Sequence, residues 1–252
     1  AIERQRGHER HGSCGVGFGE TCQRNESHDP RHALTVGELA RMTYGDLESR
    51  WKAILHGYVP QRLAQLGLPA DALGDSLAQD AVLERFIDDC SYFLEHAVLA
   101  KPALLKADAF VLEGAQGLAL DENLGVFPYV TRSKTGLPWA LEFLNQAVDT
   151  TIPVTAWYLT RAYTTRHGAG PLPYEQAWAP PGFEDPTNRP NAFQGTLRLA
   201  PLDATALAER IQQDRQRSTP WLAGRTVTTG ISVSCLDQMG ETTPLAEGAP
   251  IA

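Results

Sequence analysis

The stretch AFVLEGAQG, residues 109–117, decides the fold class, because a short apolar run ends there in a glycine turn. Such a run predicts a buried β-strand over 109–112. Residues 138–148 then show helical spacing, and 152–165 alternate as a strand does. The order strand, helix, strand predicts an α/β fold with a mixed, largely parallel central sheet and helices on both faces.

Further elements are predicted on both sides of this unit. Thr35 and Glu38 can satisfy each other's backbone amides as a capping box, so we expect a helix to begin there. Apolar residues recur at helical spacing in three other segments, which are 47–55 before Pro60, 77–94 after Asp75, and 204–217. The segment 226–235 predicts a final strand. Since 171–190 holds six prolines, we expect a long functional loop there.

Composition limits the class of protein. The chain has 252 residues, 42% of them hydrophobic, and no convincing linker, so we predict a single domain over 1–252. Its net charge of −8 argues against a general binder of nucleic acids or anionic membranes, which needs clustered positive charge. No apolar run reaches the roughly 18 residues of a membrane span, and no signal peptide opens the sequence. We therefore expect a cytoplasmic protein.

The four cysteines show no CxxC spacing, which favours a reducing compartment. Residues of the types that bind zinc gather near the start of the chain, namely His8, His11, Cys14, Cys22, His28 and His32. Their spacing fits no standard zinc pattern. We predict that this region is a loop with exposed histidines and that the chain has no metal site.

Several loops carry groups suited to binding a nucleotide. Residues 12–19 are rich in glycine and can bring backbone amides to an anion, although a flexible loop explains them equally well. Gln116 follows a predicted strand, where α/β proteins bind ligands, but it could also cap a turn. The segment 131–134 offers hydroxyls and charge or is a solvated turn. His167 lies on a glycine-shaped loop, and no GxSxG nucleophile motif accompanies it.

Taken together, these segments resemble the adenylosuccinate synthetase family. The resemblance runs from about Arg10 to Asp237 in the family's order, through HGSCGVGFGE, LTVGEL, FVLEGAQGLALDENLGVFPYVTRSKT and TRHGAGPLPYE. It implies a P-loop-NTPase-like fold and a homodimeric ligase that joins IMP to L-aspartate. In that reaction GTP phosphorylates the 6-oxygen of the base, Mg²⁺ neutralises charge, and the aspartate amine displaces phosphate.

The resemblance also implies roles for individual residues around the nucleotide. Ser13 and Cys14 fall where the family holds the IMP phosphate, and Thr131 matches a second phosphate-binding threonine. Gln116 matches the glutamine near the nucleotide and is our candidate catalytic residue. Arg31 falls where an arginine reaches the IMP phosphate of the neighbouring subunit, which implies active sites shared across a dimer.

Two later segments match the sites for the other substrates. Gln194, Gly195, Thr196 and Arg198 resemble the aspartate-binding loop, which is richer in arginine in longer members. Cys235, Leu236 and Asp237 resemble the segment that reads guanine, with cysteine in place of the family's lysine. We expect these residues to bind the amino acid and the triphosphate.

The chain departs from the family pattern at both ends. The GDEGKGK phosphate loop with the catalytic aspartate, the GH pair with the general acid, and the closing nucleotide segment are absent. A chain without that base and acid is not expected to turn over alone, so we expect part of a longer protein rather than a degenerate relative. Two alternatives stay open, a short-branch ligase acting on dGMP with ATP and a non-catalytic nucleotide-binding or interaction module.

Overall fold

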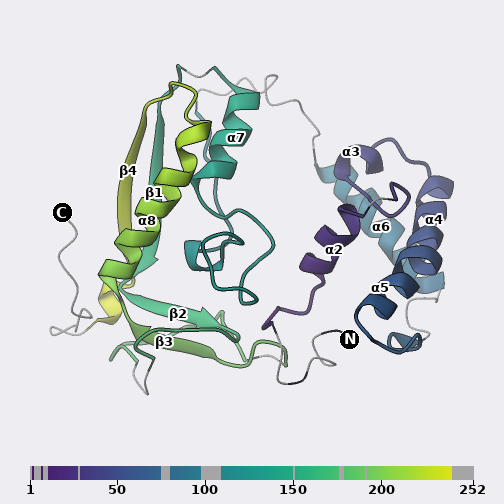
Figure 1. Ribbon diagram of the computed structural model, residues 1–252, viewed down its shortest axis with the longest axis horizontal. Coiled ribbons are helices and arrows are strands. Elements are labelled where there is room, and N and C mark those ends of the chain that lie inside the picture. The colour runs from purple at the N-terminus through teal and green to yellow at the C-terminus, as the bar shows by residue number, and fades with distance from the viewer. Residues whose placement is uncertain are drawn as a thin grey trace. The chain divides into compact units, whose positions relative to one another are not determined.

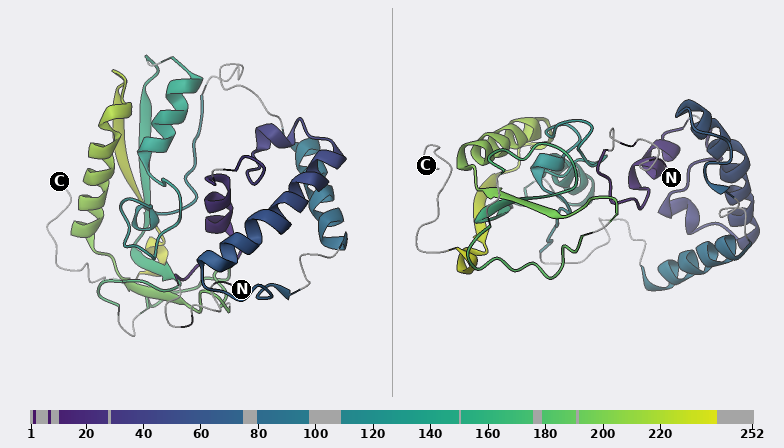
Figure 2. Two further views of the ribbon diagram at one scale, coloured as in Figure 1. Left: turned by 45° about the vertical axis from the view of Figure 1, so that its right-hand side comes forward. Right: turned by 90° about the horizontal axis from the view of Figure 1, so that it is seen from below.

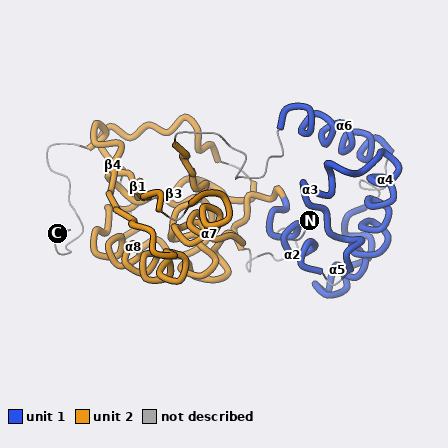
Figure 3. Tube along the Cα trace, turned by 90° about the horizontal axis from the view of Figure 1, so that it is seen from above, with its two compact units in different colours: residues 1–7, 17–100 blue, residues 8–16, 101–252 orange. Residues whose placement is uncertain are grey.

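The computed structural model describes residues 2, 7, 11–27, 29–74, 80–97, 109–149, 151–175, 179–190 and 192–239. These residues form two compact units, shown in two colours in Figure 3. Unit 1 comprises residues 1–7 and 17–100, and unit 2 comprises residues 8–16 and 101–252. Within the described ranges, no helix combines the length and the apolar character that crossing a membrane requires.

Unit 1 is built from helices, which Figure 1 labels. They are α2 (Phe18–Asn25), α3 (Val36–Leu39), α4 (Tyr44–Ala53), the π-helix η2 (Ile54–Tyr58), α5 (Val59–Gln65) and α6 (Asp80–His96). The capping box of Thr35 and Glu38 is confirmed, although the helix that follows it has only four residues. Thr43 and Asp46 form a second box and start α4.

The core of unit 1 is apolar. Leu39, Leu47, Ile87 and Cys90 are buried together, and they come from α3, α4 and α6. The helical periodicity predicted over 77–94 is confirmed from residue 80 onward, while 75–79 lie outside the described residues. Apolar spacing at three and four residues therefore identified the faces that pack.

Unit 2 combines strands and helices (Figure 1). Its elements are η5 (Leu118–Leu120), α7 (Leu137–Ala147), β1 (Val154–Arg161), β2 (Tyr163–His167), β3 (Leu197–Pro201), α8 (Ala204–Ser218), η6 (Thr219–Trp221), β4 (Val227–Ser234) and η7 (Leu236–Gln238). β1 and β4 pair in parallel, from Val154 opposite Val227 to Arg161 opposite Ser234. β2 and β3 pair antiparallel, with Tyr163 opposite Pro201.

These elements confirm the α/β class with a parallel pair of strands and helices. The helices predicted over 138–148 and 204–217 and the strand predicted over 226–235 are present within a residue or two. The single strand predicted over 152–165 is divided at Ala162, which is buried between β1 and β2. In the described parts of 171–190 the chain forms neither helix nor strand, as its prolines require.

The strand predicted over 109–112 is wrong. These residues have no regular structure, and Val111 is 93% exposed. Within the described residues no strand pairs with this segment, so it has no partner for the hydrogen bonds of a sheet. The apolar run has the composition of a strand, but composition does not indicate whether a neighbouring strand is there to pair with it.

Asp214 on α8 joins several elements of unit 2. Figure 2 shows α8 running along β1 and β4. The buried Asp214 carboxylate accepts hydrogen bonds from the Tyr158 hydroxyl of β1 at 2.9 Å and from the Leu137 backbone N–H of α7 at 3.0 Å. Its Oδ1 lies against Gly136, where an added Cβ would be 1.9 Å away. Burial raises the Asp214 pKa above its ordinary value.

Candidate functional site

Two glycines bring the 11–16 segment into close contact with other loops of unit 2. A Cβ on Gly12 would lie 2.7 Å from the Ala169 backbone nitrogen, and one on Gly15 would lie 2.9 Å from the Phe193 ring. Both glycines have positive φ, at +75° and +80°. Glycine is needed at these positions for the conformation and for the close approach.

The turn that follows β2 lies against this segment. A Cβ on Gly168 would be 2.9 Å from the Gly12 carbonyl oxygen and 3.6 Å from Gln194 Cγ. The His167 Nε2 lies 3.1 Å from the Gly195 carbonyl oxygen. The structure therefore brings together three segments that were each predicted to bind substrate, those around Ser13 and Cys14, around His167, and around Gln194 and Gly195.

Two arginines bind the backbone of the turn 168–170. Arg166 donates from Nε to the Ala169 carbonyl at 2.8 Å and from Nη2 to the Tyr129 carbonyl at 2.9 Å. Arg198 donates from Nη1 to the carbonyls of Gly168 and Gly170, both at 2.9 Å. The turn is thus held by charged donors, whose hydrogen bonds are stronger than neutral ones.

The other edge of the Arg198 guanidinium binds Glu175. Nε donates to Oε1 at 2.7 Å, and Nη2 donates to Oε2. This bidentate pairing lowers the Glu175 pKa and raises the Arg198 pKa. Burial lowers the Arg166 pKa, and the nearby charges of Arg198 and Arg210 lower it further. The expectation that Arg198 binds the amino acid stays a prediction, and in this arrangement Arg198 already holds a carboxylate.

Gln116 and Thr131 lie on a loop ordered by a buried aspartate. Asp121 accepts hydrogen bonds from the backbone N–H groups of Thr135 at 2.6 Å and Asn123 at 2.9 Å. Burial alone would raise the Asp121 pKa, but these bonds and the Arg217 charge outweigh it and lower the pKa. Gln116 is exposed, and Thr131 donates its backbone N–H to the Leu120 carbonyl at 2.7 Å.

Cys235, Leu236 and Asp237 lie where β4 meets η7. Cys235 has a φ of +60°, and Leu236 and Asp237 are exposed. The Tyr163 hydroxyl donates to Gln238 Oε1 at 2.5 Å, and the Gly182 N–H donates to the Gln238 carbonyl at 3.2 Å. These bonds tie η7 to β2 and to the proline-rich loop, so the three predicted triphosphate-binding residues stand on an anchored turn.

Arg31 belongs to unit 1 and has a different environment. Its side chain is 77% exposed and forms a bidentate ion pair with Asp29, in which Nη2 lies 2.7 Å from Oδ2 and Nε lies 3.0 Å from Oδ1. The Arg31 guanidinium lowers the Asp29 pKa well below its usual range. Arg31 therefore points to solvent with one carboxylate partner, as a residue available for intermolecular contact would.

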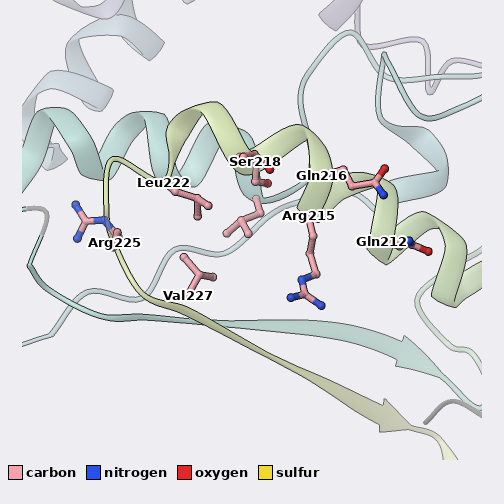
Figure 4. A pocket seen from close by; sticks show the side chains of 9 residues that line it. Gln212, Arg215, Gln216, Ser218, Leu222, Arg225 and Val227 are labelled. Carbon is pink, nitrogen blue, oxygen red and sulfur yellow. The ribbon is translucent and has the colours of Figure 1, made fainter.

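Unit 2 also has a pocket beside α8 (Figure 4). Its volume is about 390 Å³, and it is lined by Leu137, Gln212, Arg215, Gln216, Ser218, Thr219, Leu222, Arg225 and Val227. None of the predicted site residues lines it. Arg225 is buried and caps the chain after α7 by donating to the carbonyls of Asp149 at 2.9 Å and Ile152 at 2.7 Å.

The described ranges contain no group of three or more His, Cys, Asp or Glu residues that could hold a metal ion. The prediction of a loop with exposed histidines near the start of the chain is wrong in part, because Cys22 lies in the helix α2 and His32 is buried. His8 and His28 lie outside the described ranges. A Mg²⁺ ion is commonly held by one or two carboxylates together with substrate phosphates, which is a smaller set of protein ligands than such a group of three. We assign no ligand to the ion.

Comparison with known proteins decides the family. The adenylosuccinate synthetase family model matches residues 1–231. The chain belongs to the adenylosuccinate synthetase family. Two fungal synthetases are similar to it, that of Saccharomyces cerevisiae strain S288c at 33% identity over 139 residues and that of Yarrowia lipolytica at 39% over 104 residues. The Pseudoalteromonas atlantica synthetase is 30% identical over 182 residues.

The matched lengths differ between this chain and those synthetases. The three matches cover 55%, 40% and 69% of this chain but only 26%, 21% and 38% of the respective relatives. The chain thus spans less than two fifths of the length of the curated relatives that it matches. Membership of the adenylosuccinate synthetase family is established over most of this chain, while the whole enzyme's activity requires a separate argument.

Sequence reasoning missed the residues that hold the site in place. Glu175 binds Arg198 and Asp121 binds backbone amides, and neither was predicted as a site residue. Arg166 and Glu175 do lie within the TRHGAGPLPYE segment that carries the family resemblance. Asp121 likewise lies within the FVLEGAQGLALDENLGVFPYVTRSKT segment that carries the resemblance.

Proposed function

We propose that this chain is the nucleotide-binding body of an adenylosuccinate synthetase, which condenses IMP with L-aspartate at the expense of GTP to form adenylosuccinate. Family membership supports this activity. The observation that carries it is the meeting of the 11–16, 167–170 and 193–196 segments in unit 2. Each of these segments matches a substrate-binding segment of the family.

In this proposal the IMP phosphate binds at Ser13, Cys14 and Thr131. Gln116 contacts the base or the ribose, because a side-chain amide both donates and accepts hydrogen bonds. His167, beside Gly195, contributes to the same substrate site. The side chains of Gln194 and Thr196 and the backbone of Gly195 face the amino acid. Cys235, Leu236 and Asp237 bind the base of the triphosphate.

The proposed enzyme is a homodimer with shared sites. Arg31 is exposed and would reach the phosphate of the partner's IMP, exchanging the Asp29 carboxylate for a phosphate oxygen. GTP supplies the phosphoryl group, and Mg²⁺ supplies charge neutralisation on its phosphates when bound. No step is assigned to the ion through residues of this chain.

The test is product formation by the full-length gene product. We expect adenylosuccinate, identified by mass spectrometry, from IMP, aspartate and GTP, and a loss of at least a hundredfold in kcat for Gln116→Ala. Product from dGMP and ATP instead would move the protein to the short branch of the family. Absence of any product, together with absence of heat on titration with IMP, GMP or dGMP, would contradict the proposal.

A further inference from the structure

Every carbonyl of the turn 168–170 accepts a hydrogen bond from an arginine. Arg198 binds the first and the third carbonyl, and Arg166 binds the second. Gly168 is buried and Ala169 is exposed, so a water-bound turn would leave at least the buried carbonyl without a partner. Two guanidinium groups committed to three successive carbonyls indicate that the geometry of this turn matters.

The two arginines face each other across the β2–β3 pair. Arg166 and Arg198 are directly opposite in the antiparallel register. Like charges in this position destabilise a sheet. Glu175 offsets one of the charges through its bidentate pairing with Arg198, and the carbonyls of the turn and of Tyr129 solvate the guanidiniums. Repulsion between the two arginines therefore destabilises the β2–β3 pair, and the hydrogen bonds that order the turn offset this destabilisation.

The two arginines also determine which backbone groups the turn 168–170 presents to the 11–16 segment. In a planar trans peptide the N–H points opposite to the C=O, so the N–H groups of Ala169 and Gly170 point away from the arginines. Gly12 packs against this turn, since a Cβ on it would lie 2.7 Å from the Ala169 nitrogen. Movement of the turn would therefore displace the segment that carries Ser13 and Cys14.

We propose that Arg198, Arg166 and Glu175 form a clamp that positions the 11–16 segment for the nucleotide, and that Arg198 is a positioning residue rather than a ligand of the amino acid. Four of the five N–H donors of Arg198 are engaged by Glu175 and by the turn. To bind Arg198 through two N–H donors, an amino-acid carboxylate would have to displace Glu175 from the guanidinium. This inference rests on the proposed function only in taking 11–16 as part of the nucleotide site.

The experiment compares Arg198→Lys with a matched control, Arg215→Lys, in the full-length gene product. Lysine keeps the charge, but its single ammonium group cannot bind the Gly168 and Gly170 carbonyls and both oxygens of the Glu175 carboxylate at the same time. Arg215 is exposed and lies outside the clamp. We expect Arg198→Lys to weaken IMP binding about tenfold by calorimetry and to leave the KM for aspartate within about twofold. Arg215→Lys should change neither.

Hydrogen exchange separates positioning from general damage. In Arg198→Lys we expect faster exchange of the amides of 12–16 while those of α4 and α6 are unchanged. Glu175→Gln, which keeps one acceptor for Arg198, should lie between wild type and Glu175→Ala in IMP affinity. These two variants serve as the test if Arg198→Lys does not fold.

The possible outcomes are distinct. A tenfold rise in the KM for aspartate with unchanged IMP affinity would overturn the inference and return Arg198 to the amino-acid site. Unchanged IMP affinity in all of the clamp variants would also overturn it. Failure of wild type to bind any purine monophosphate would instead overturn the proposed function, since the clamp could still be seen in the exchange of 12–16.

Discussion

The interiors of the two units are stabilised by different kinds of contact. In unit 1 the buried residues are almost all apolar, with Leu39, Leu47, Ile87 and Cys90 at the centre. Its charged pairs lie at the surface, as Lys52 with Glu48 does, or are partly buried, as Arg62 with Glu20 is. In unit 2 the buried residues include Asp121, Asp214 and Arg225, and each binds backbone groups of other segments.

This difference indicates which contacts fix the backbone conformation of the functional loops. Apolar packing is non-directional and stabilises a helical unit without setting the course of a loop. Hydrogen bonds to a buried carboxylate or guanidinium are directional, and they fix particular backbone atoms. The loops of the proposed nucleotide site lie in unit 2, where Asp121 anchors the loop before α7 and the two clamp arginines anchor the turn after β2.

The largest effect is expected from Ile87→Ala. Deleting a buried isoleucine leaves a cavity in the core of unit 1 and costs about 3–4 kcal/mol of unfolding free energy. Val36, at 42% exposure, provides the control, and Val36→Ala should cost less than about 1 kcal/mol. Urea unfolding followed by hydrogen exchange should show the loss in α6. An equal loss in β1 and β4 would mean that the two units unfold as one.

Asp214→Ala is expected to cost nearly as much, but in unit 2. It leaves the Tyr158 hydroxyl and the Leu137 N–H without their buried acceptor, which costs about 3 kcal/mol in total. Asp214→Asn keeps an oxygen in place and should cost about 1 kcal/mol or less. The same exchange experiment measures both variants. If Asp214→Ala lowered the unfolding free energy no more than Asp214→Asn does, hydrogen bonds to a buried carboxylate would not be what distinguishes unit 2 from unit 1.

The two buried aspartates are expected to give opposite pH dependences. The Asp121 pKa is lowered on folding, so its contribution is present above the ordinary pKa of 3.8 and is lost as the pH falls through the folded value. The Asp214 pKa is raised, so its contribution is present below 3.8 and is lost as the pH rises through the folded value.

Substitution by asparagine isolates these two contributions. In unit 2, Asp121→Asn should make the unfolding free energy less sensitive to acid below about pH 4. Asp214→Asn should remove a loss of stability that wild type suffers on going from acid toward neutral pH. Thermal unfolding at several pH values measures both slopes. Two slopes of the same sign would contradict the assigned environments.

The smallest effect on stability is expected from Arg31→Leu. Its pairing with Asp29 is at the surface, where such pairs contribute little, so the unfolding temperature should not change measurably. Binding of IMP by the full-length protein should weaken about tenfold, because a charge-assisted contact to phosphate is lost. Sedimentation should show a dimer for both proteins. A wild-type monomer at micromolar concentration would remove the basis of the shared site.

The fold could be predicted where local rules decide it. The capping box at Thr35, the periodicity of α6 and the strand and helix patterns of β1, α7 and α8 gave the correct elements. Tertiary context decided the exceptions. Residues 109–112 have the composition of a strand but no partner among the described strands. Pro60 was expected to follow a helix, yet it lies in the first turn of α5, after a π-helix.

The candidate site could be predicted only as a set of separate segments. Family motifs pointed to the neighbourhoods of Cys14, His167 and Gln194, and the structure places these segments together. Arg198 was expected to bind the amino acid, and its pairing with Glu175, 23 residues earlier in the chain, was not predicted. Contacts between loops at such separations depend on the path of the backbone, which residue patterns alone do not specify.

We propose that unit 2 carries the site for the purine monophosphate. Hydrogen exchange of the full-length protein with and without saturating IMP tests it most directly. We predict that IMP slows exchange in 12–16, 113–117, 167–170 and 193–196, while α4 and α6 of unit 1 exchange at unchanged rates. Binding of IMP with protection confined to α4 and α6, and none in those four segments, would contradict the account.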